Sequence, residues 1–196
     1  MRLLKLAYLF LKNLLEAPRG RSGAGVRSEA FTKRILNCVI IGRLMGLDRI
    51  FGCMEAGTSV FIGTVGASGM PSCVRAIGVR SDDDLATATI YLPMATSRET
   101  LANLATTHRL AVVATRPIEH AAIQLKGSSI TARLARDDEE AFVRSRLEGL
   151  ADVLDSLGVP RRVTKSFAVW PAFAIEMRVE HIFEQTPGPK AGTCLR

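Results

Sequence analysis

Aromatic residues and paired cysteines are scarce in this chain. Tryptophan, tyrosine and phenylalanine together make up 6% of its 196 residues, which argues against a stacking platform for nucleic acids. The four cysteines form no C-x-x-C pair, and none has a histidine at zinc-finger spacing; they are Cys38, Cys53, Cys73 and Cys194. Scattered thiols of this kind are typical of a reducing compartment. We therefore expect a cytoplasmic protein with no nucleic-acid partner and no metal site.

The sequence also lacks the motifs of common hydrolases. Its histidines show no His-x-x-x-His spacing, and the serines near predicted turns have no G-x-S-x-G context. These residues are His108, His120 and His181, and Ser68, Ser72 and Ser128. No side chain is predicted to act as a general base, and the catalytic residues stay unassigned. This absence is compatible with cofactor chemistry, in which the protein mainly supplies position.

The net charge of +7 is concentrated at the N-terminus. Residues 1–45 contain nine Lys or Arg and two Glu, whereas residues 46–196 contain 17 basic and 17 acidic residues. The basic character therefore belongs to the first segment and does not indicate a nucleic-acid surface on the rest. We predict a basic extension over residues 1–44 and a folded domain over residues 45–196.

Residues 1–15 are apolar, with spaced lysines. Lys5 and Lys12 interrupt the run, so it is too short and too charged for a membrane span. The pair Ala17-Pro18 makes a poor signal-peptide cleavage site. Two interpretations stay open. The segment is a basic amphipathic helix that contacts a membrane or a partner, or it is not native protein and the true start is Met45-Gly46.

From residue 47 onward the apolar pattern predicts alternating strands interrupted by helices. Six strands are predicted over 58–65, 71–79, 86–92, 110–115, 119–134 and 172–183, with helices over 47–56, 96–107 and 137–157. Thr96 and Glu99 match a capping box at the start of the second helix. Short connections between alternating strands favour an antiparallel sheet that closes into a small barrel. The fold class is therefore mainly β, with peripheral helices.

The strand at residues 119–134 changes phase near its middle. Ile123 and Leu125 occupy odd positions, whereas the later apolar residues Ile130 and Leu134 occupy even ones. A one-residue slip turns every side chain to the opposite face. We therefore predict a bulge or bend near Gly127.

The ordered motifs of the chain resemble those of the pyridoxamine 5'-phosphate oxidase-like split-barrel flavoproteins, and most closely an uncharacterised bacterial branch. The motifs are Gly69-Met70-Pro71 before Arg75, Thr96-Ser97-Arg98 before a helix, an apolar strand ending at Pro117, Gln124-Leu125-Lys126-Gly127, and Gln185-Thr186-Pro187-Gly188-Pro189. The resemblance covers residues 47–192 and implies a six-stranded antiparallel split barrel.

The resemblance implies a homodimer that binds FMN at the subunit interface. F420 and haem are less favoured alternatives to FMN as the cofactor. The implied phosphate contacts are Arg75, Ser97 and Arg98, with Ala76 and Thr96 as further cofactor-binding residues, and Gln124 and Lys126 are implied to lie near the flavin ring. The Arg-rich C-terminal signature of true pyridoxamine-phosphate oxidases is absent. The expected activity is therefore an FMN-dependent oxidation or reduction of an unknown small molecule, with a different substrate from theirs.

The residues themselves leave alternatives open. A helix start with Ser97 and Arg98 suits a phosphate, but the same residues could simply cap the helix and face solvent. Arg75 needs an anionic partner inside a strand, and Glu99 could serve as well as a phosphate. A second functional hypothesis also remains, in which the barrel is a non-catalytic module that stores or senses a flavin, F420 or haem.

Overall fold

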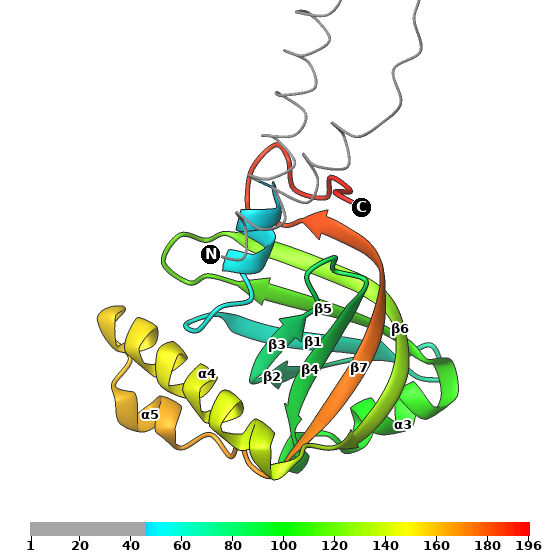
Figure 1. The fold of residues 1–196 in the computed structure, drawn as a ribbon, viewed down its shortest axis with the longest axis horizontal. Helices are drawn as coiled ribbons and strands as arrows, with labels where there is room; N and C mark the ends of the chain where they lie inside the picture. Colours follow the sequence, from blue (N-terminus) through cyan, green and yellow to red (C-terminus); the bar gives the residue numbers. More distant parts are fainter. Residues whose placement is uncertain (1–45) are drawn as a thin grey trace, which may run out of the picture. The chain divides into compact units, whose positions relative to one another are not determined.

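An antiparallel sheet curls into a half-barrel in the computed structural model, which describes residues 46–196 (Figure 1). The predicted extension at residues 1–44 lies outside the described part. The strand order is β2-β1-β5-β6-β7-β4-β3. The fold is mainly β, as predicted, and this curled sheet is consistent with a split barrel.

The sheet has seven strands rather than the predicted six. The strands are β1 (Ser59–Val65), β2 (Pro71–Ala76), β3 (Gly78–Ser81), β4 (Thr87–Pro93), β5 (Arg109–Thr115), β6 (Ala122–Leu134) and β7 (Ala172–Glu184). The helices are α3 (Arg98–Thr107), α4 (Asp137–Ser156) and α5 (Arg161–Lys165), with a 3₁₀ turn η1 (Met94–Thr96) and a further helical stretch at residues 46–52. Figure 1 shows α4 and α5 side by side, with α3 at a separate edge of the sheet.

The extra strand arises because the predicted strand 71–79 changes partner at Ile77. Its first part pairs with β1, and its second part pairs with β4. The Ile77 N–H donates to the Tyr91 carbonyl oxygen at 2.8 Å. One residue therefore links the two edges of the sheet. Gly78 follows at a crowded point, where a Cβ would lie 2.8 Å from Cγ of Arg146.

Alternation along the strands separates a filled interior from an outer face. Ile62, Ile90, Val112 and Ile175 point inward and are fully buried. A smaller apolar cluster lies between the sheet and α4; its buried members are Ile77, Tyr91, Val143, Leu147, Val169 and Ala174. This second cluster holds α4 against the outside of the half-barrel.

The phase change in the fifth predicted strand is confirmed. The register between β6 and β7 shifts between Lys126 and Gly127, and again between Ser129 and Thr131. A Cβ at Gly127 would overlap the carbonyl group of Arg178. Glycine is therefore required at this bulge, because the neighbouring backbone occupies the space of a side chain.

Two helix-end predictions were wrong. The N-cap of α3 is Ser97 and makes no side-chain capping bond, because Thr96 belongs to the preceding 3₁₀ turn. The Ser97 hydroxyl instead donates to the Met94 carbonyl oxygen at 2.9 Å. The helix predicted over residues 47–56 ends at residue 52, and turns lead from there to Gly57, which adopts a positive φ of 87°.

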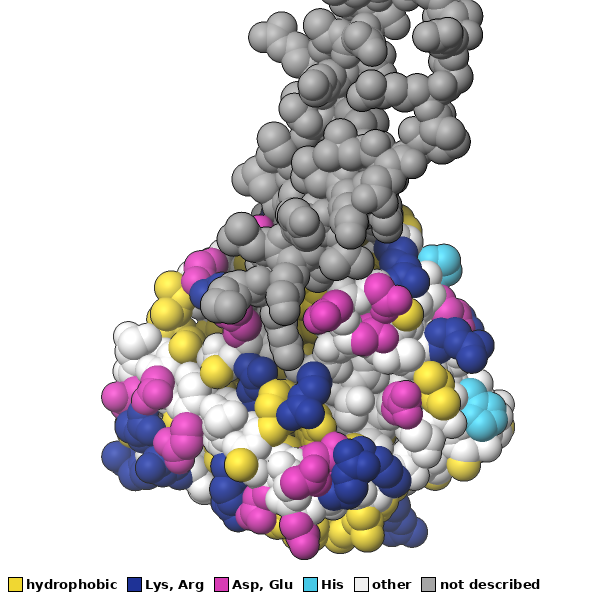
Figure 2. All heavy atoms as spheres, viewed as in Figure 1, with side chains coloured by type: hydrophobic (Ala, Val, Ile, Leu, Met, Phe, Trp, Pro, Cys, Tyr) yellow, Lys and Arg dark blue, Asp and Glu magenta, His cyan; other side chains and the backbone are white. Residues whose placement is uncertain are grey.

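Charges of both signs are interspersed on the described surface. In the view of Figure 2, basic and acidic side chains are mixed over the face that it draws, and residues 46–196 contain 17 of each. Cys53, Cys73 and Cys194 form no disulfide within the described residues; Cys38 lies outside them. Within residues 46–196, no helix is long and apolar enough to cross a membrane.

Candidate functional site

The outer face of β2, β1, β5, β6 and β7 carries a row of five side chains that the strand register places next to one another. In order across the sheet they are Arg75, Phe61, Val113, Gln124 and Phe183. We call this set the first row. Since neighbouring strands lie about 4.8 Å apart, Arg75 and Gln124 are separated by roughly 14 Å of sheet. Two predicted cofactor residues from distant parts of the sequence thus share one face.

A second row lies beside the first on the same face. Its members are Cys73, Gly63, Ala111, Lys126 and His181. Gly63 and Ala111 lack large side chains. The surface of the outer face is therefore recessed between the larger side chains of Phe61 and Lys126. A flat ligand could approach the backbone closely at this point.

Arg75 is a half-buried cation with no acidic partner among residues 46–196. Its Nη1 donates to Ser59 Oγ at 2.8 Å. Its guanidinium lies 4.6 Å from the ring centre of Phe61 and 5.7 Å from that of Phe167. Burial lowers the pKa of Arg75, although an arginine stays charged at neutral pH. The predicted alternative, an ion pair with Glu99, is not formed in the structure.

The opposite end of the face is also basic. Lys126 is exposed, and its Nζ lies 4.8 Å from the ring centre of Phe183. The neighbouring carboxylate, Glu180, is already engaged by Ser128 at 2.9 Å and Arg109 at 3.0 Å. The hydrogen bond from Ser128, and then the charge of Arg109, hold the pKa of Glu180 below its usual value. Lys126 therefore brings a positive charge without an ion-pair partner among the described residues to the second row.

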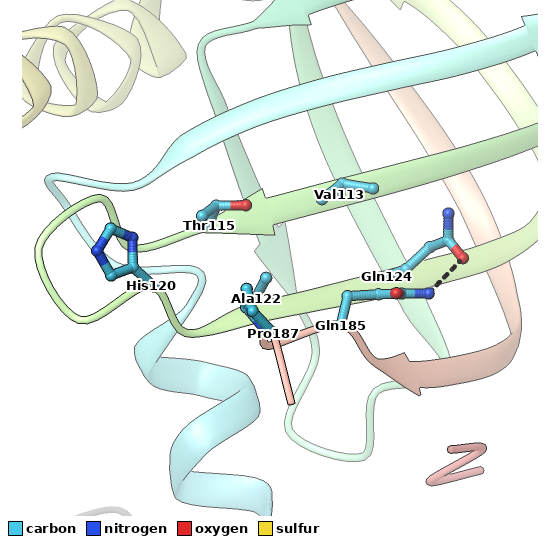
Figure 3. A pocket seen from close by; sticks show the side chains of 7 residues that line it. All are labelled: Val113, Thr115, His120, Ala122, Gln124, Gln185 and Pro187. Atoms are coloured by element: carbon cyan, nitrogen blue, oxygen red, sulfur yellow. Dashed lines mark hydrogen bonds between the residues drawn. The ribbon is translucent and has the colours of Figure 1, made fainter. Parts of the chain in front are cut away.

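Gln124 lines a pocket of about 390 Å³ at the edge of the first row (Figure 3). The lining residues are Val113, Thr115, His120, Ala122, Gln124, Gln185 and Pro187. Gln185 Nε2 donates to Gln124 Oε1 at 3.3 Å. The tail after β7 thus closes one side of the pocket.

Three other predicted cofactor residues lie at the turn before α3, a helix that packs against β1 and β2. Thr96 and Arg98 are exposed at the turn between β4 and α3, and Ser97 is buried there with its hydroxyl bonded to Met94. Among the described residues, no hydrogen bond or ion pair joins them to Arg75. Ala76 points into the interior, so it could contact a cofactor only through its backbone.

A second basic cluster was missed from the sequence. Arg80 of β3 and Arg146 of α4 both stack on Phe142, with their guanidinium carbons 4.2 Å and 4.5 Å from its ring centre. Arg146 Nε is buried without a hydrogen-bond partner in the described chain. Burial, and then the charge of Arg80, lower the pKa of Arg146, while the charge of Glu55 partly opposes them. Two unpaired guanidinium groups at one ring suit an anion.

Several solved structures are similar to this chain at low sequence identity. No protein-family model and no curated sequence matches the chain. An FMN-binding protein from Syntrophomonas wolfei is 13% identical, over 79% of this chain and 94% of its own, with a TM-score of 0.45. An F420 reductase is 14% identical, over 67% of this chain and 93% of its own, with a TM-score of 0.45. HutZ, the haem storage protein of Vibrio cholerae, is 11% identical, over 67% of this chain and 88% of its own, with a TM-score of 0.38. Identities this low describe a likeness of fold alone.

Within residues 46–196, no three His, Cys, Asp or Glu side chains gather as metal ligands. The carboxylate with the most perturbed pKa, Glu139, is buried under Tyr91 and Arg133, away from both rows. The outer face instead offers cations, aromatic rings and amides, which are groups that hold and orient a ligand.

Proposed function

We propose that this protein binds FMN on the outer face of the half-barrel and uses it to oxidise or reduce a small anionic molecule. The observation that carries the proposal is the half-buried Arg75, which has no acidic partner in residues 46–196. A buried charge without a counter-charge is costly. A ligand phosphate would supply the counter-charge and accept two forked hydrogen bonds from the guanidinium.

The remainder of the face suits the ring end of the same cofactor. The low floor at Gly63 and Ala111 leaves room for a planar ring, and Gln124 and Lys126 lie on its far side. When bound, FMN would supply the hydride chemistry, and the protein would tune it. Lys126 would stabilise negative charge on the reduced ring. In the proposed dimer, both copies would form the cofactor site. Thr96, Ser97 and Arg98 would then be candidates to contact the cofactor phosphate.

A homodimer is part of the proposal. The first row exposes aromatic surface at Phe61, which is 38% accessible in the single chain. A second copy packed on the outer face would cover this surface and enclose the ligand. Arg80 and Arg146 would hold the anionic group of the substrate, because their guanidinium groups stack on the same ring and neither has a carboxylate partner in the described chain. Free thiols agree with the cytoplasmic location expected from the sequence.

The test compares FMN with riboflavin, which lacks the phosphate. The full chain is titrated with each flavin, and quenching of flavin fluorescence is recorded. Arg75→Met is expected to weaken FMN binding by tenfold to a hundredfold, which is the loss of one or two charge-assisted hydrogen bonds. The same change should leave riboflavin affinity within about twofold.

Arg144→Met is the matched control. It removes an exposed arginine that pairs only with Glu140 on α4, so both affinities should stay unchanged. If Arg75→Met reduces the two affinities equally, Arg75 does not hold the phosphate. If the wild-type protein binds neither flavin, the proposal is wrong. Light scattering in the same samples tests the dimer.

The non-catalytic alternative is separated by turnover. Steady-state assays with NADH or NADPH and an electron acceptor are run with the FMN-loaded protein and with free FMN. A rate well above that of free FMN supports an oxidoreductase. A rate equal to that of free FMN favours a module that stores or senses its ligand.

A further inference from the structure

The guanidinium group of Arg75 is contacted from two separate segments of the chain. Phe61 lies opposite Arg75 in the register of β1 and β2, and its ring centre is 4.6 Å from the guanidinium carbon. Ser59, also on β1, accepts a hydrogen bond from Arg75 Nη1 at 2.8 Å. The other segment follows α5, where the ring centre of Phe167 lies 5.7 Å from the same carbon. The helical part of the chain therefore reaches this point of the sheet.

The position of Phe167 is set by its own packing. Its N–H donates to the carbonyl oxygen of Thr164, a fully buried residue of α5, at 3.1 Å. The Phe167 ring packs against the apolar cluster beneath α4, as does Trp170. The residues directly before and after it, Ser166 and Ala168, are exposed, whereas Phe167 is half-buried. The ring is therefore held against the folded body, beside Arg75.

These contacts orient the guanidinium group and leave most of its donors available. An arginine side chain has five N–H donors, and within residues 46–196 Ser59 accepts from one nitrogen of Arg75. None of the Arg75 nitrogens is among the buried atoms that lack a partner. An aromatic ring attracts a cation through its π electrons, but it does not neutralise the charge. The remaining N–H groups are therefore open to an anion.

A guanidinium group that is already ordered binds an anion more tightly than a mobile one. A long side chain in solvent samples many rotamers, and ordering it on binding opposes the association. Here the contacts of Arg75 order it in the free protein. A lysine would not reproduce the arrangement, because a guanidinium is planar and stacks on rings whereas an ammonium is a compact point charge. The site therefore uses the shape of the arginine as well as its charge.

We propose that Ser59, Phe61 and Phe167 are positioning residues that hold Arg75 ready for a phosphate group. Arg75 alone would contact the phosphate, and the three other residues would act through it. The choice of FMN as the phosphate ligand rests on the proposed function, whereas the ordering of Arg75 does not. The segment after α5 would then contribute to phosphate affinity, although it lies far from β2 in the sequence.

The ordering is measured in the full chain without FMN. NMR relaxation of the Arg75 Nε–Hε group reports the motion of this side chain on the ps–ns timescale, and the wild type is expected to give an order parameter near that of the backbone. Phe167→Leu and Ser59→Ala should each lower it, and Phe167→Tyr, which keeps the ring, should not. Trp170→Leu is the matched control, because it removes a ring of the same apolar cluster that does not stack on Arg75.

The second measurement is the ratio of the FMN and riboflavin affinities, from fluorescence titrations. Phe167→Leu is expected to weaken FMN binding by about fivefold to tenfold, the loss of one cation–π contact at a partly buried site, and to leave riboflavin affinity within about twofold. A substitution that only loosens the fold would weaken both flavins equally. Arg75→Lys keeps the charge and should still bind FMN at least fivefold more weakly than the wild type does.

The outcomes distinguish the inference from the proposed function. An Arg75 side chain that is as mobile in the wild type as in Phe167→Leu overturns the inference, and so does wild-type FMN affinity in Arg75→Lys. FMN binding that depends on Arg75 but is unchanged in Phe167→Leu also overturns it, while the proposed function stands. An ordered Arg75 whose Nε–Hε signal shifts with inorganic phosphate, in a protein that binds no FMN, would sustain the inference while the proposed function fails.

Discussion

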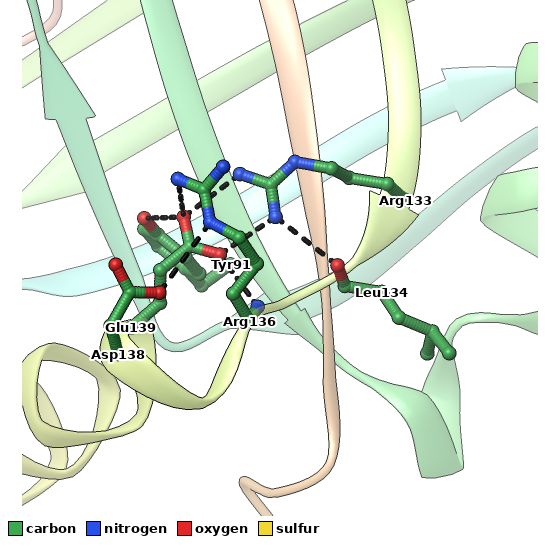
Figure 4. A network of polar contacts seen from close by, with 6 residues as sticks. All are labelled: Tyr91, Arg133, Leu134, Arg136, Asp138 and Glu139. Carbon is green, nitrogen blue, oxygen red and sulfur yellow. Dashed lines mark hydrogen bonds and ion pairs between the residues drawn. The ribbon is translucent and has the colours of Figure 1, made fainter.

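Glu139 is the residue whose removal should destabilise this fold in a pH-dependent way. It is 5% exposed at the start of α4. Its carboxylate accepts hydrogen bonds from Tyr91 Oη at 2.9 Å, from the Arg133 guanidinium at 2.7 Å and 2.9 Å, and from the Arg136 N–H at 2.8 Å (Figure 4). These bonds join β4, β6 and α4 at one point. The change to consider is Glu139→Gln, which keeps the shape and removes the charge.

The magnitude follows from the pKa of the carboxyl group. The hydrogen bonds from Arg133, partly opposed by burial and aided by Arg136 and Tyr91, lower the pKa of Glu139 from 4.5 to about 2. That difference corresponds to about 3 kcal/mol of stability at neutral pH. The Arg133 side chain is 37% exposed, so screening by solvent reduces the value to about 2 kcal/mol. Burial, and then the bond to Glu139, raise the pKa of Tyr91 to about 12, so its hydroxyl stays a donor.

The pH dependence has a defined direction. Above pH 4.5 the carboxylate is charged in both the folded and the unfolded chain, and its whole contribution is present. Between pH 4.5 and about 2 the unfolded chain binds a proton that the folded chain does not. Stability is therefore lost as the pH falls through this window. Glu139→Gln lacks the titrating group, so its deficit relative to the wild type should shrink over the same window.

The assay is urea unfolding followed by tryptophan fluorescence. Trp170 is the only tryptophan in the sequence and packs against the apolar cluster beneath α4, so its signal reports on this region. Glu140→Gln is the matched control, because Glu140 is also an acid of the first turn of α4 but forms a more exposed pair with Arg144. It should cost less than about 0.5 kcal/mol. Equal losses in the two variants, or a Glu139→Gln deficit that persists undiminished near pH 2, would refute the reasoning.

Two further predictions concern stability. Gly127→Ala should destabilise the protein by about 3 kcal/mol, since its methyl group would overlap the Arg178 carbonyl; an unchanged melting temperature would show that the bulge tolerates a side chain. Arg146→Met should be neutral or stabilising by about 1 kcal/mol, because it replaces a partly buried, unpaired charge whose Nε has no partner; a clear loss of stability in urea unfolding would assign Arg146 a structural role instead of ligand binding.

The sequence predicts best what depends on neighbouring residues. The bulge in β6 was predictable because the apolar residues change from odd to even positions at Gly127. Since the same face of the sheet stays buried along the strand, this change requires an extra residue in the register. The change of partner at Ile77 was not predictable. The chain stays extended through it, and what changes is the neighbouring strand, which lies far away in the sequence.

Predictions from short sequence patterns were wrong where two local structures could form from the same residues. Thr96 and Glu99 match a capping box, but a 3₁₀ turn at Met94–Thr96 takes Thr96 first. For Arg75, the sequence predicts an anionic partner; the structure shows Ser59 and the rings of Phe61 and Phe167 beside it and no ion pair with Glu99. The pair Arg80 and Arg146 depends on how α4 packs on β3, which no spacing in the sequence encodes.

The alternation that builds the barrel also decides where a ligand can bind. The interior positions Ile62, Ile90, Val112, Leu125 and Ile175 are at most 1% exposed, so these side chains fill the core of the described half-barrel. Every second residue of the same strands points the other way, and there the chain places Arg75, Gln124 and Lys126 with rings and small residues between them. A polar residue at those positions costs the core nothing. The outer face is thus free to vary with function while the inner face is fixed by packing, and the Gln-Leu-Lys-Gly run of β6 carries both roles in alternate residues.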